Sequence, residues 1–163
     1  MNAQAFRHFY HYHFAENRKT WDYIRSLSDE QFTRQSDYSH GSVRDLVVHL
    51  MSVDDGWFSE LRGGAFPEPL DPAVTDRAAV RAYWDGVERR MRDYLDALRD
   101  DMLFDKPIVE PAEDKDLIVW QVLLHVANHG TDHRAQILRS LNDLAVKTHS
   151  QDYVFYAYDH PPS

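Results

Sequence analysis

Apolar residues recur along most of this chain at intervals of three and four, the spacing that places side chains on one face of a helix. The segments with this pattern are residues 4–27, 42–61, 75–100 and 117–141. Each presents an apolar stripe on one side and polar residues on the other, which is typical of helices that share a core. The pattern therefore predicts an all-α protein, a four-helix bundle.

Capping and breaking residues mark the ends of these segments. Ser42-Val-Arg-Asp45 has the form of a capping box at the start of the second helix, and Gly63-Gly64 follows its end. Thr75 can cap the third helix. Pro107 and Pro111 prevent that helix from continuing beyond Asp105, because proline lacks the amide hydrogen that a helix needs. We expect a long connection there, which suits a crossover or the lip of a pocket.

Polar residues interrupt the apolar stripes of the first two helices. His13 and Asn17 lie inside the first stripe, either as hydrogen-bonded core residues or as the wall of a polar pocket. Asp54 lies about 40° from the centre of the second stripe and His49 about 100° from it. A carboxylate facing a core needs a cation or a hydrogen-bond donor. Alternatively, Asp54 is a rim carboxylate paired with an arginine.

The fourth helix carries three histidines at a spacing of four: His125, His129 and His133. One such pair is unremarkable among ten histidines, but two consecutive pairs are uncommon. Relative to the apolar stripe, His133 lies about 30°, His129 about 70° and His125 about 110° from the centre. We therefore expect His129 and His133 to face the core, where Gly130 leaves room beside them. The alternative is a helix face of solvated or core-satisfied histidines.

The composition of the chain excludes several classes of functional site and of binding partner. The chain has 163 residues, 43% of them hydrophobic and 13% aromatic, which predicts one globular domain over residues 1–163. Cysteine is absent, so disulfides, thiolate metal sites and a cysteine nucleophile are excluded. A net charge of −9 argues against nucleic acid or an anionic membrane as partner. No apolar run suits a bilayer span and no signal peptide is evident, so we expect a cytoplasmic protein.

Histidines on two helices suggest a metal site inside the bundle. His49, His129 and His133 would supply three neutral nitrogen ligands and leave a position for water or substrate, the arrangement of catalytic centres. A divalent metal held in this way lowers the pKa of a bound water or thiol. Asp54 and Asn17 are then candidates for orienting a ligand or the bound water. The candidate catalytic residues are Asp54, Asn17 and His13.

The helical layout, a histidine in the second helix followed five residues later by an acid, and the run His129-x-x-x-His133-Arg-x-Gln136-Ile137 resemble the DinB/YfiT family of small proteins. The resemblance implies an up-down-down-up four-helix bundle, a three-histidine site for zinc, nickel or another divalent metal, and frequent homodimers. Position by position, it points to His49, His129 and His133 as ligands. Ala135 departs from the family, which often has glycine there, and this affects only local packing.

The resemblance also implies a range of activities. Relatives include transferases and isomerases that use mycothiol, bacillithiol or glutathione, with the metal activating the thiol. The leading hypothesis is therefore a metal-dependent enzyme acting on a small molecule, with a low-molecular-weight thiol activated for S-transfer or isomerisation. The alternatives are a metal-dependent hydrolase and a non-catalytic, stress-related binding or dimerisation module with a structural metal. His125 or His13 as a fourth ligand would favour the last of these.

The C-terminal segment, Asp152–Tyr158, is rich in aromatic residues. Exposed aromatic side chains of this number are unfavourable in water. We expect the segment to pack across the bundle or into the interface of a homodimer.

Overall fold

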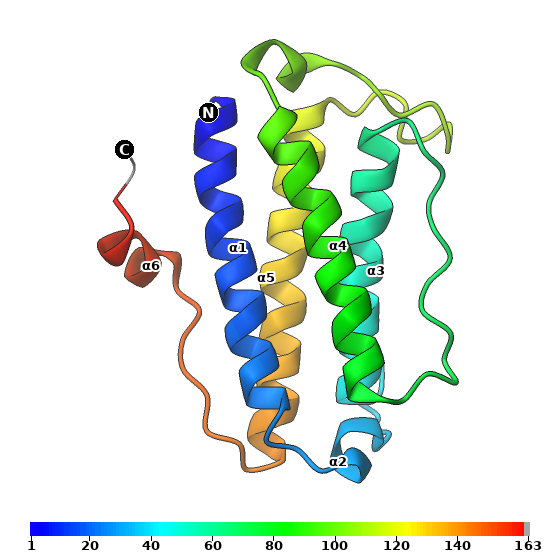
Figure 1. Cartoon of the computed structure of the whole chain (residues 1–163), viewed down its shortest axis with the longest axis vertical. Helices are drawn as coiled ribbons and strands as arrows, with labels where there is room; N and C mark the ends of the chain where they lie inside the picture. The colour runs from blue at the N-terminus through cyan, green and yellow to red at the C-terminus, as the bar shows by residue number, and fades with distance from the viewer. Residues whose placement is uncertain (162–163) are drawn as a thin grey trace.

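The segments with helical periodicity form the four long helices of the protein, whose computed structural model describes residues 1–161 (Figure 1). These are α1 (Ala3–Ile24), α3 (Val43–Leu61), α4 (Arg77–Ala97) and α5 (Val119–Asp143). Shorter helices are α2 (Asp29–Thr33), the 3₁₀ helix η1 (Asp100–Phe104) and α6 (Tyr153–Asp159). No strand occurs among the described residues, and the predicted all-α helical bundle is confirmed.

The helices follow an up-down-down-up order. Figure 1 shows α1 and α5 running in one direction and α3 and α4 in the other. Helix α5 packs against α1 and α3, while α4 packs against α3 and α1. Because α3 and α4 are parallel, the chain must return along the whole bundle between them, and residues 62–76 do so (Figure 1). Of the two alternatives for the connection after Asp105, a crossover or the lip of a pocket, the crossover is wrong, since residues 105–118 stay at one end of the bundle.

The N-terminal cap of α3 is the residue that the sequence predicted, and that of α4 is not. The Ser42 hydroxyl accepts a hydrogen bond from the Asp45 amide at 3.1 Å, and Asp45 reciprocates, as a capping box requires. At α4 the cap is Asp76, whose carboxylate accepts from the Ala79 amide at 2.8 Å. Thr75 is therefore one residue before the true cap. The carboxylate also adds negative charge at the positive end of the helix dipole.

The interior divides into two apolar clusters, one in each half of the bundle. The first cluster includes apolar residues from the start of α1, residues 3–14, and from the start of α5, residues 119–127. The second includes apolar residues from the end of α1, beginning at residue 21, and from the end of α5, beginning at residue 137. Between them lies a layer of buried polar side chains from three helices. Its members are His13, Asn17, Asp54 and Arg134. We call this set the polar layer, and its position halfway along the bundle places it beside the histidines of α3 and α5.

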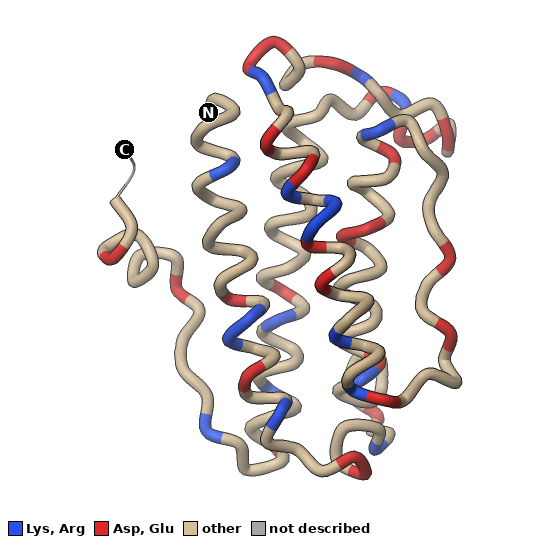
Figure 2. The backbone as a smooth tube through the Cα atoms, in the orientation of Figure 1, with Lys and Arg blue, Asp and Glu red and all other residues tan. Residues whose placement is uncertain are grey.

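Most charged residues lie on the outside of the bundle. Figure 2 shows Lys and Arg interspersed with Asp and Glu along α4, where neighbouring turns form ion pairs such as Arg92 with Glu88 at 2.7 Å. Such surface pairs contribute little to stability. Among residues 1–161, no helix is both long enough and apolar enough to cross a membrane.

Candidate metal centre

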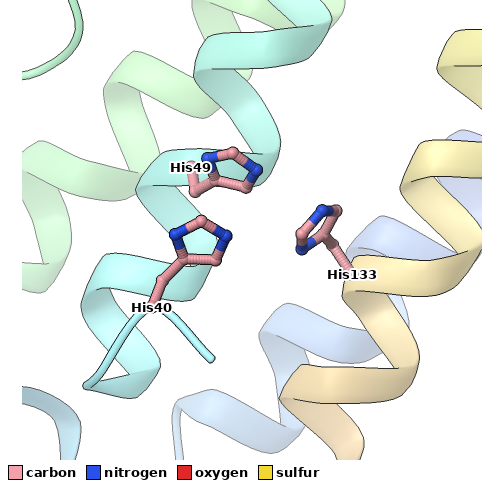
Figure 3. A group of neighbouring side chains, drawn as sticks. All are labelled: His40, His49 and His133. Carbon is pink, nitrogen blue, oxygen red and sulfur yellow. The ribbon is translucent and has the colours of Figure 1, made fainter. Parts of the chain in front are cut away.

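Histidines from three parts of the chain converge on the face between α3 and α5. Figure 3 shows His40 and His49 lying together and facing His133 across the gap between the helices. One ring nitrogen from each of these three lies within 4.8 Å of the others. His129 joins them from one turn earlier on α5, with its ring centroid 4.1 Å from that of His133 and 5.3 Å from that of His49. We call these four residues the histidine cluster.

Secondary structure positions most of the cluster. His129 and His133 lie four residues apart on α5, so they stack on one face of the helix. His49 lies on α3, which packs along α5 and places its ring centroid 4.5 Å from that of His133. His40 lies in the loop of residues 34–42 and stacks on His49, with 3.8 Å between centroids and 19° between ring planes.

The three histidines that the sequence singled out as ligands therefore lie together, and their role as ligands stays a prediction. His125 is exposed and contacts Trp57, with 5.1 Å between ring centroids, so it lies outside the cluster. Sequence reasoning missed His40. It belongs to an irregular loop, where no periodicity shows which way a side chain points, and its only signal was a histidine nine residues before His49.

Burial favours the uncharged form of the three cluster histidines on α3 and α5. Desolvation, then the neighbouring His133 and His49, lower the pKa of His129 to about 3. Desolvation, then His40 and His133, lower the pKa of His49 to about 4. Desolvation also lowers the pKa of His133. Neutral imidazole is the form that binds a metal, because a protonated ring has no free lone pair.

The buried nitrogens of α5 also suit a cation. The Nδ1 atoms of His129 and His133 are buried and have no hydrogen-bond partner within the structure. Buried polar atoms are nearly always satisfied, so two such atoms side by side point to a missing partner. Nitrogens around a tetrahedral ion, with bonds of about 2.1 Å, lie about 3.4 Å apart. One ring nitrogen from each of His40, His49 and His133 lies within 4.8 Å of the others, and the His129 ring is next to that of His133, with 4.1 Å between centroids. These nitrogen donors are of the kind that a divalent metal binds.

The polar layer next to the cluster forms a hydrogen-bonded chain. Arg134 Nη1 donates to His13 Nδ1 at 3.2 Å and to Asn17 Oδ1 at 2.9 Å. An arginine only donates, so His13 Nδ1 must accept and the ring proton must be on Nε2. That nitrogen lies 3.2 Å from Asp54 Oδ2, to which it donates. Desolvation lowers the pKa of His13, which keeps it in this neutral tautomer.

Asp54 is fully buried, with 0% of its surface exposed. The alternative of a rim carboxylate paired with an arginine applies to its neighbour instead, since Asp55 binds the Arg90 guanidinium at 2.7 and 2.9 Å. The Oδ1 atom of Asp54 is buried without a partner. Desolvation lowers the pKa of His133, and the charge of Asp54 acts in the opposite direction to a smaller extent, so the polar layer and the histidine cluster are electrostatically connected.

Gly130 makes room for the polar layer. A Cβ atom at this position would lie 2.4 Å from Cε1 of His13 and 2.8 Å from its Nδ1, closer than such contacts allow. The glycine leaves space on this face of α5, as its position in the sequence predicts, and the His13 ring fills that space. The glycine therefore permits the contact between α5 and α1 at the level of the polar layer.

Two comparisons with known proteins bear on this site. A model of the DinB family matches residues 1–162. The chain is also similar to "Protein DinB" of Bacillus subtilis (strain 168), with 23% identity over 166 residues, covering 97% of this chain and 96% of that protein. The match extends over all four long helices, and thus over every residue of the histidine cluster and of the polar layer.

Proposed function

The chain belongs to the DinB family, and on that premise we propose that it is a metal-dependent enzyme whose divalent ion is held by His49, His129 and His133. The observation that carries the proposal is the convergence of neutral imidazoles from two helices, with two buried nitrogens that have no partner in the protein. Nitrogen ligands of this kind suit zinc or nickel. When bound, the metal supplies Lewis acidity that lowers the pKa of a coordinated thiol or water.

The polar layer supplies the orienting group. Asp54 is held by His13 through one carboxylate oxygen, and its other oxygen is unpartnered. That second oxygen is the acceptor that we propose for the hydrogen of a thiol or of a water molecule bound at the cluster. Arg134 fixes the tautomer of His13 and so keeps the carboxylate in place. Asp54 is thus the candidate for a catalytic residue, and His13 and Asn17 position it.

The substrate class we propose is a small molecule reacting with a low-molecular-weight thiol, by S-transfer or isomerisation. The protein has no cysteine, so the sulfur nucleophile in such a reaction must come from the substrate. Neutral imidazole ligands leave the ion with its full positive charge, which favours an anionic thiolate as the next donor.

A second candidate function is a non-catalytic binding module with a structural metal. The presence of His40 favours it, because a fourth protein ligand would close the coordination sphere as structural zinc sites do. Access of small ligands to the bound metal distinguishes the two.

Metal content of the untagged protein tests the ligand set. We expect one divalent ion per chain in the wild type, and loss of stoichiometric binding in His49→Ala, His129→Ala and His133→Ala, because each removes a ligand. The matched control is His125→Ala, which removes a nearby exposed histidine and should leave the stoichiometry unchanged. Equal losses at His125 and His129 would show that the assignment is wrong.

Activity is tested by assaying the metal-loaded protein with several low-molecular-weight thiols and a soluble electrophile. We expect turnover to depend on both the thiol and the metal. Turnover that survives complete removal of the metal would refute the proposal of a metal-dependent enzyme. Turnover of an ester without any thiol would show that the enzyme is a hydrolase and not a thiol-dependent transferase or isomerase.

A further inference from the structure

The loop of residues 34–42 brings one member of the histidine cluster into the site from outside the bundle. His40 is exposed, whereas His133 is buried and His49 and His129 are partly buried on their helices. The cluster thus combines helix-borne histidines with one loop-borne histidine. The inference that follows rests on the proposed metal site and concerns the role of His40 in binding the metal.

We propose that His40 is a displaceable fourth ligand, which occupies the open coordination position of the resting metal and leaves when a substrate donor binds. The first observation is distance: a ring nitrogen of His40 lies within 4.8 Å of ligand atoms of both His49 and His133. The second is orientation, since the imidazoles of His40 and His49 face the same ring across the gap (Figure 3). His40 thus has the reach of a ligand.

The loop is attached in a way that allows this ligand to leave. Residues 34–40 are exposed, so moving them uncovers no core. Near its tip, the Ser39 hydroxyl donates to the side-chain oxygen of Gln136 on α5, one turn after His133. The Gln136 amide in turn donates to Asp132 at 3.0 Å. A single exposed hydrogen bond of this kind contributes little net stability, because water competes for both partners, so it holds the loop only weakly.

The ends of the loop are fixed more firmly and define its shape. The Ser36 hydroxyl donates to the Gly41 carbonyl at 2.7 Å, and Gln35 donates to the Asp45 carboxylate at 2.8 Å. Ser39 and Gly41 have positive φ angles of 53° and 100°, which turn the chain on both sides of His40. His40 is therefore presented by a small preformed turn, and not by an unstructured segment.

Displacement of His40 would allow the same site to be closed, with four histidine ligands, and open, with three. With His40 bound, four imidazoles surround the ion and exclude adventitious donors. When a sulfur or oxygen donor takes its place, the His40 imidazole leaves the ion as a neutral group, and the three helix-borne histidines retain the metal. No covalent bond of the chain changes in this exchange.

Cobalt(II) is the probe that tests the proposal, because its visible absorption reports the number and type of ligands. The wild type, His40→Ala and the control His125→Ala are each loaded with Co²⁺, their spectra recorded, and each titrated with azide. We expect His40→Ala to retain stoichiometric Co²⁺ with an altered spectrum. We also expect it to bind azide about tenfold more tightly, the factor that applies when the open state of the wild type is about one-tenth populated.

The outcomes separate this proposal from the proposed function. If none of the proteins binds Co²⁺ stoichiometrically, the metal site itself is refuted. If all three bind it with the same spectrum and the same azide affinity, the metal site stands and the role of His40 is overturned. Circular dichroism establishes that the variants fold.

A second variant examines the attachment of the loop. Ser39→Gly removes the hydroxyl that contacts Gln136 while accepting the same positive φ. We expect an azide affinity between those of the wild type and His40→Ala. An affinity equal to that of the wild type would show that the hydrogen bond does not hold His40 over the metal.

Discussion

Asp54 and Asp55 are adjacent in the sequence and both buried, but the partner of Asp54 is buried and that of Asp55 is partly exposed. Asp54 is fully buried and contacts His13, while Asp55 pairs with Arg90, whose side chain is 43% exposed. The charge of Asp54 offsets that of Arg134, which is itself fully buried. Two residues of the same type therefore contribute different amounts to the free energy of unfolding. The difference depends on whether water can reach the partner when the interaction is lost.

The first prediction compares these two acids. Asp54→Asn keeps the shape of the side chain but removes a buried charge that His13 contacts and that, with Glu16, offsets the charge of Arg134, so the free energy of unfolding of the metal-free protein should fall by about 3 kcal/mol. Asp55→Asn should cost about 1 kcal/mol, because Arg90 can turn to water. Urea denaturation measures both values. A larger loss in Asp55→Asn would contradict the assigned roles.

The second prediction concerns pH. Burial, then the charge of Asp105, raises the pKa of Tyr94 to about 12, whereas an unfolded tyrosine titrates near 10. Between these values the unfolded chain has lost the proton and the native state keeps it, so the contribution of Tyr94 is complete below about pH 10 and declines as the pH rises toward 12. Tyr94→Phe removes this loss.

Urea denaturation at about pH 9 and about pH 11 measures the effect. We expect the decrease in unfolding free energy between the two pH values to be smaller in Tyr94→Phe than in the wild type. Equal decreases in the two proteins would show that Tyr94 is not protected from ionisation.

Among single residues, those on helices could be predicted and those in loops could not. The angular positions of His129, His133 and Asp54 follow from 100° per residue, and the structure places all three facing the interior. His40 reaches the same site through the turn between Ser39 and Gly41, and no periodic rule describes that turn. The exposed position of His125 also followed from the helical wheel.

At the scale of an element, α5 contains a glycine, Gly130, whose low helix propensity disfavours the helix in which it lies. Glycine in a helix interior costs about 1 kcal/mol relative to alanine, and Gly130 lies in the middle of the longest helix. The contact with His13 explains the exception, since any side chain would displace that ring. Packing between helices thus outweighs the propensity of one helix.

The third prediction follows from that balance. Gly130→Ala should destabilise the protein by about 1–3 kcal/mol, the cost of overpacking a filled core. Gly86→Ala in α4 is the matched control, since its Cβ would meet only the flexible end of Arg90 at 3.4 Å. That substitution should stabilise by about 0.5–1 kcal/mol. Thermal denaturation of both variants checks the opposite signs, and stabilisation by Gly130→Ala would contradict the packing described.

Hydrophobic periodicity predicts the four long helices but not the route between them, and the correct up-down-down-up order came only from the family resemblance. Periodicity identifies a helix without saying which of its ends meets the next one. Proline residues after Asp105 indicated a long connection, yet residues 62–76 make the crossover because α3 and α4 are parallel. The direction of each helix depends on contacts between distant segments, which the periodicity of one segment does not encode.

At the scale of the whole molecule, the C-terminal segment returns to the middle of the bundle. Gln151 accepts a hydrogen bond from Arg134 Nε at 3.0 Å and donates to the Thr131 carbonyl at 3.1 Å. Beyond it, Tyr153 of α6 packs against Phe9 and Tyr12 of α1, with ring centroids 5.3 and 5.2 Å apart. Participation of this segment in a homodimer stays a prediction.

The fourth prediction concerns this return. Gln151→Ala removes the acceptor of a buried arginine and should lower the free energy of unfolding by about 1–3 kcal/mol. Ser150→Ala is the control, because its hydroxyl bonds only to the exposed Asp152 in its own segment. Chemical denaturation distinguishes them, and equal stability of the two variants would show that Gln151 does not support Arg134.

The polar layer has a further consequence for how the bundle folds. A helix packed only through apolar residues can shift along its neighbours by one turn, about 5.4 Å, and still bury a similar surface. Such a shift of α5 would carry Arg134 into one of the apolar clusters and separate it from His13 and Asn17. Misaligned bundles would then hold an unpaired buried charge, at a cost of several kcal/mol. The layer therefore selects a single alignment of the helices, and this alignment brings the histidines of α3 and α5 to the same level.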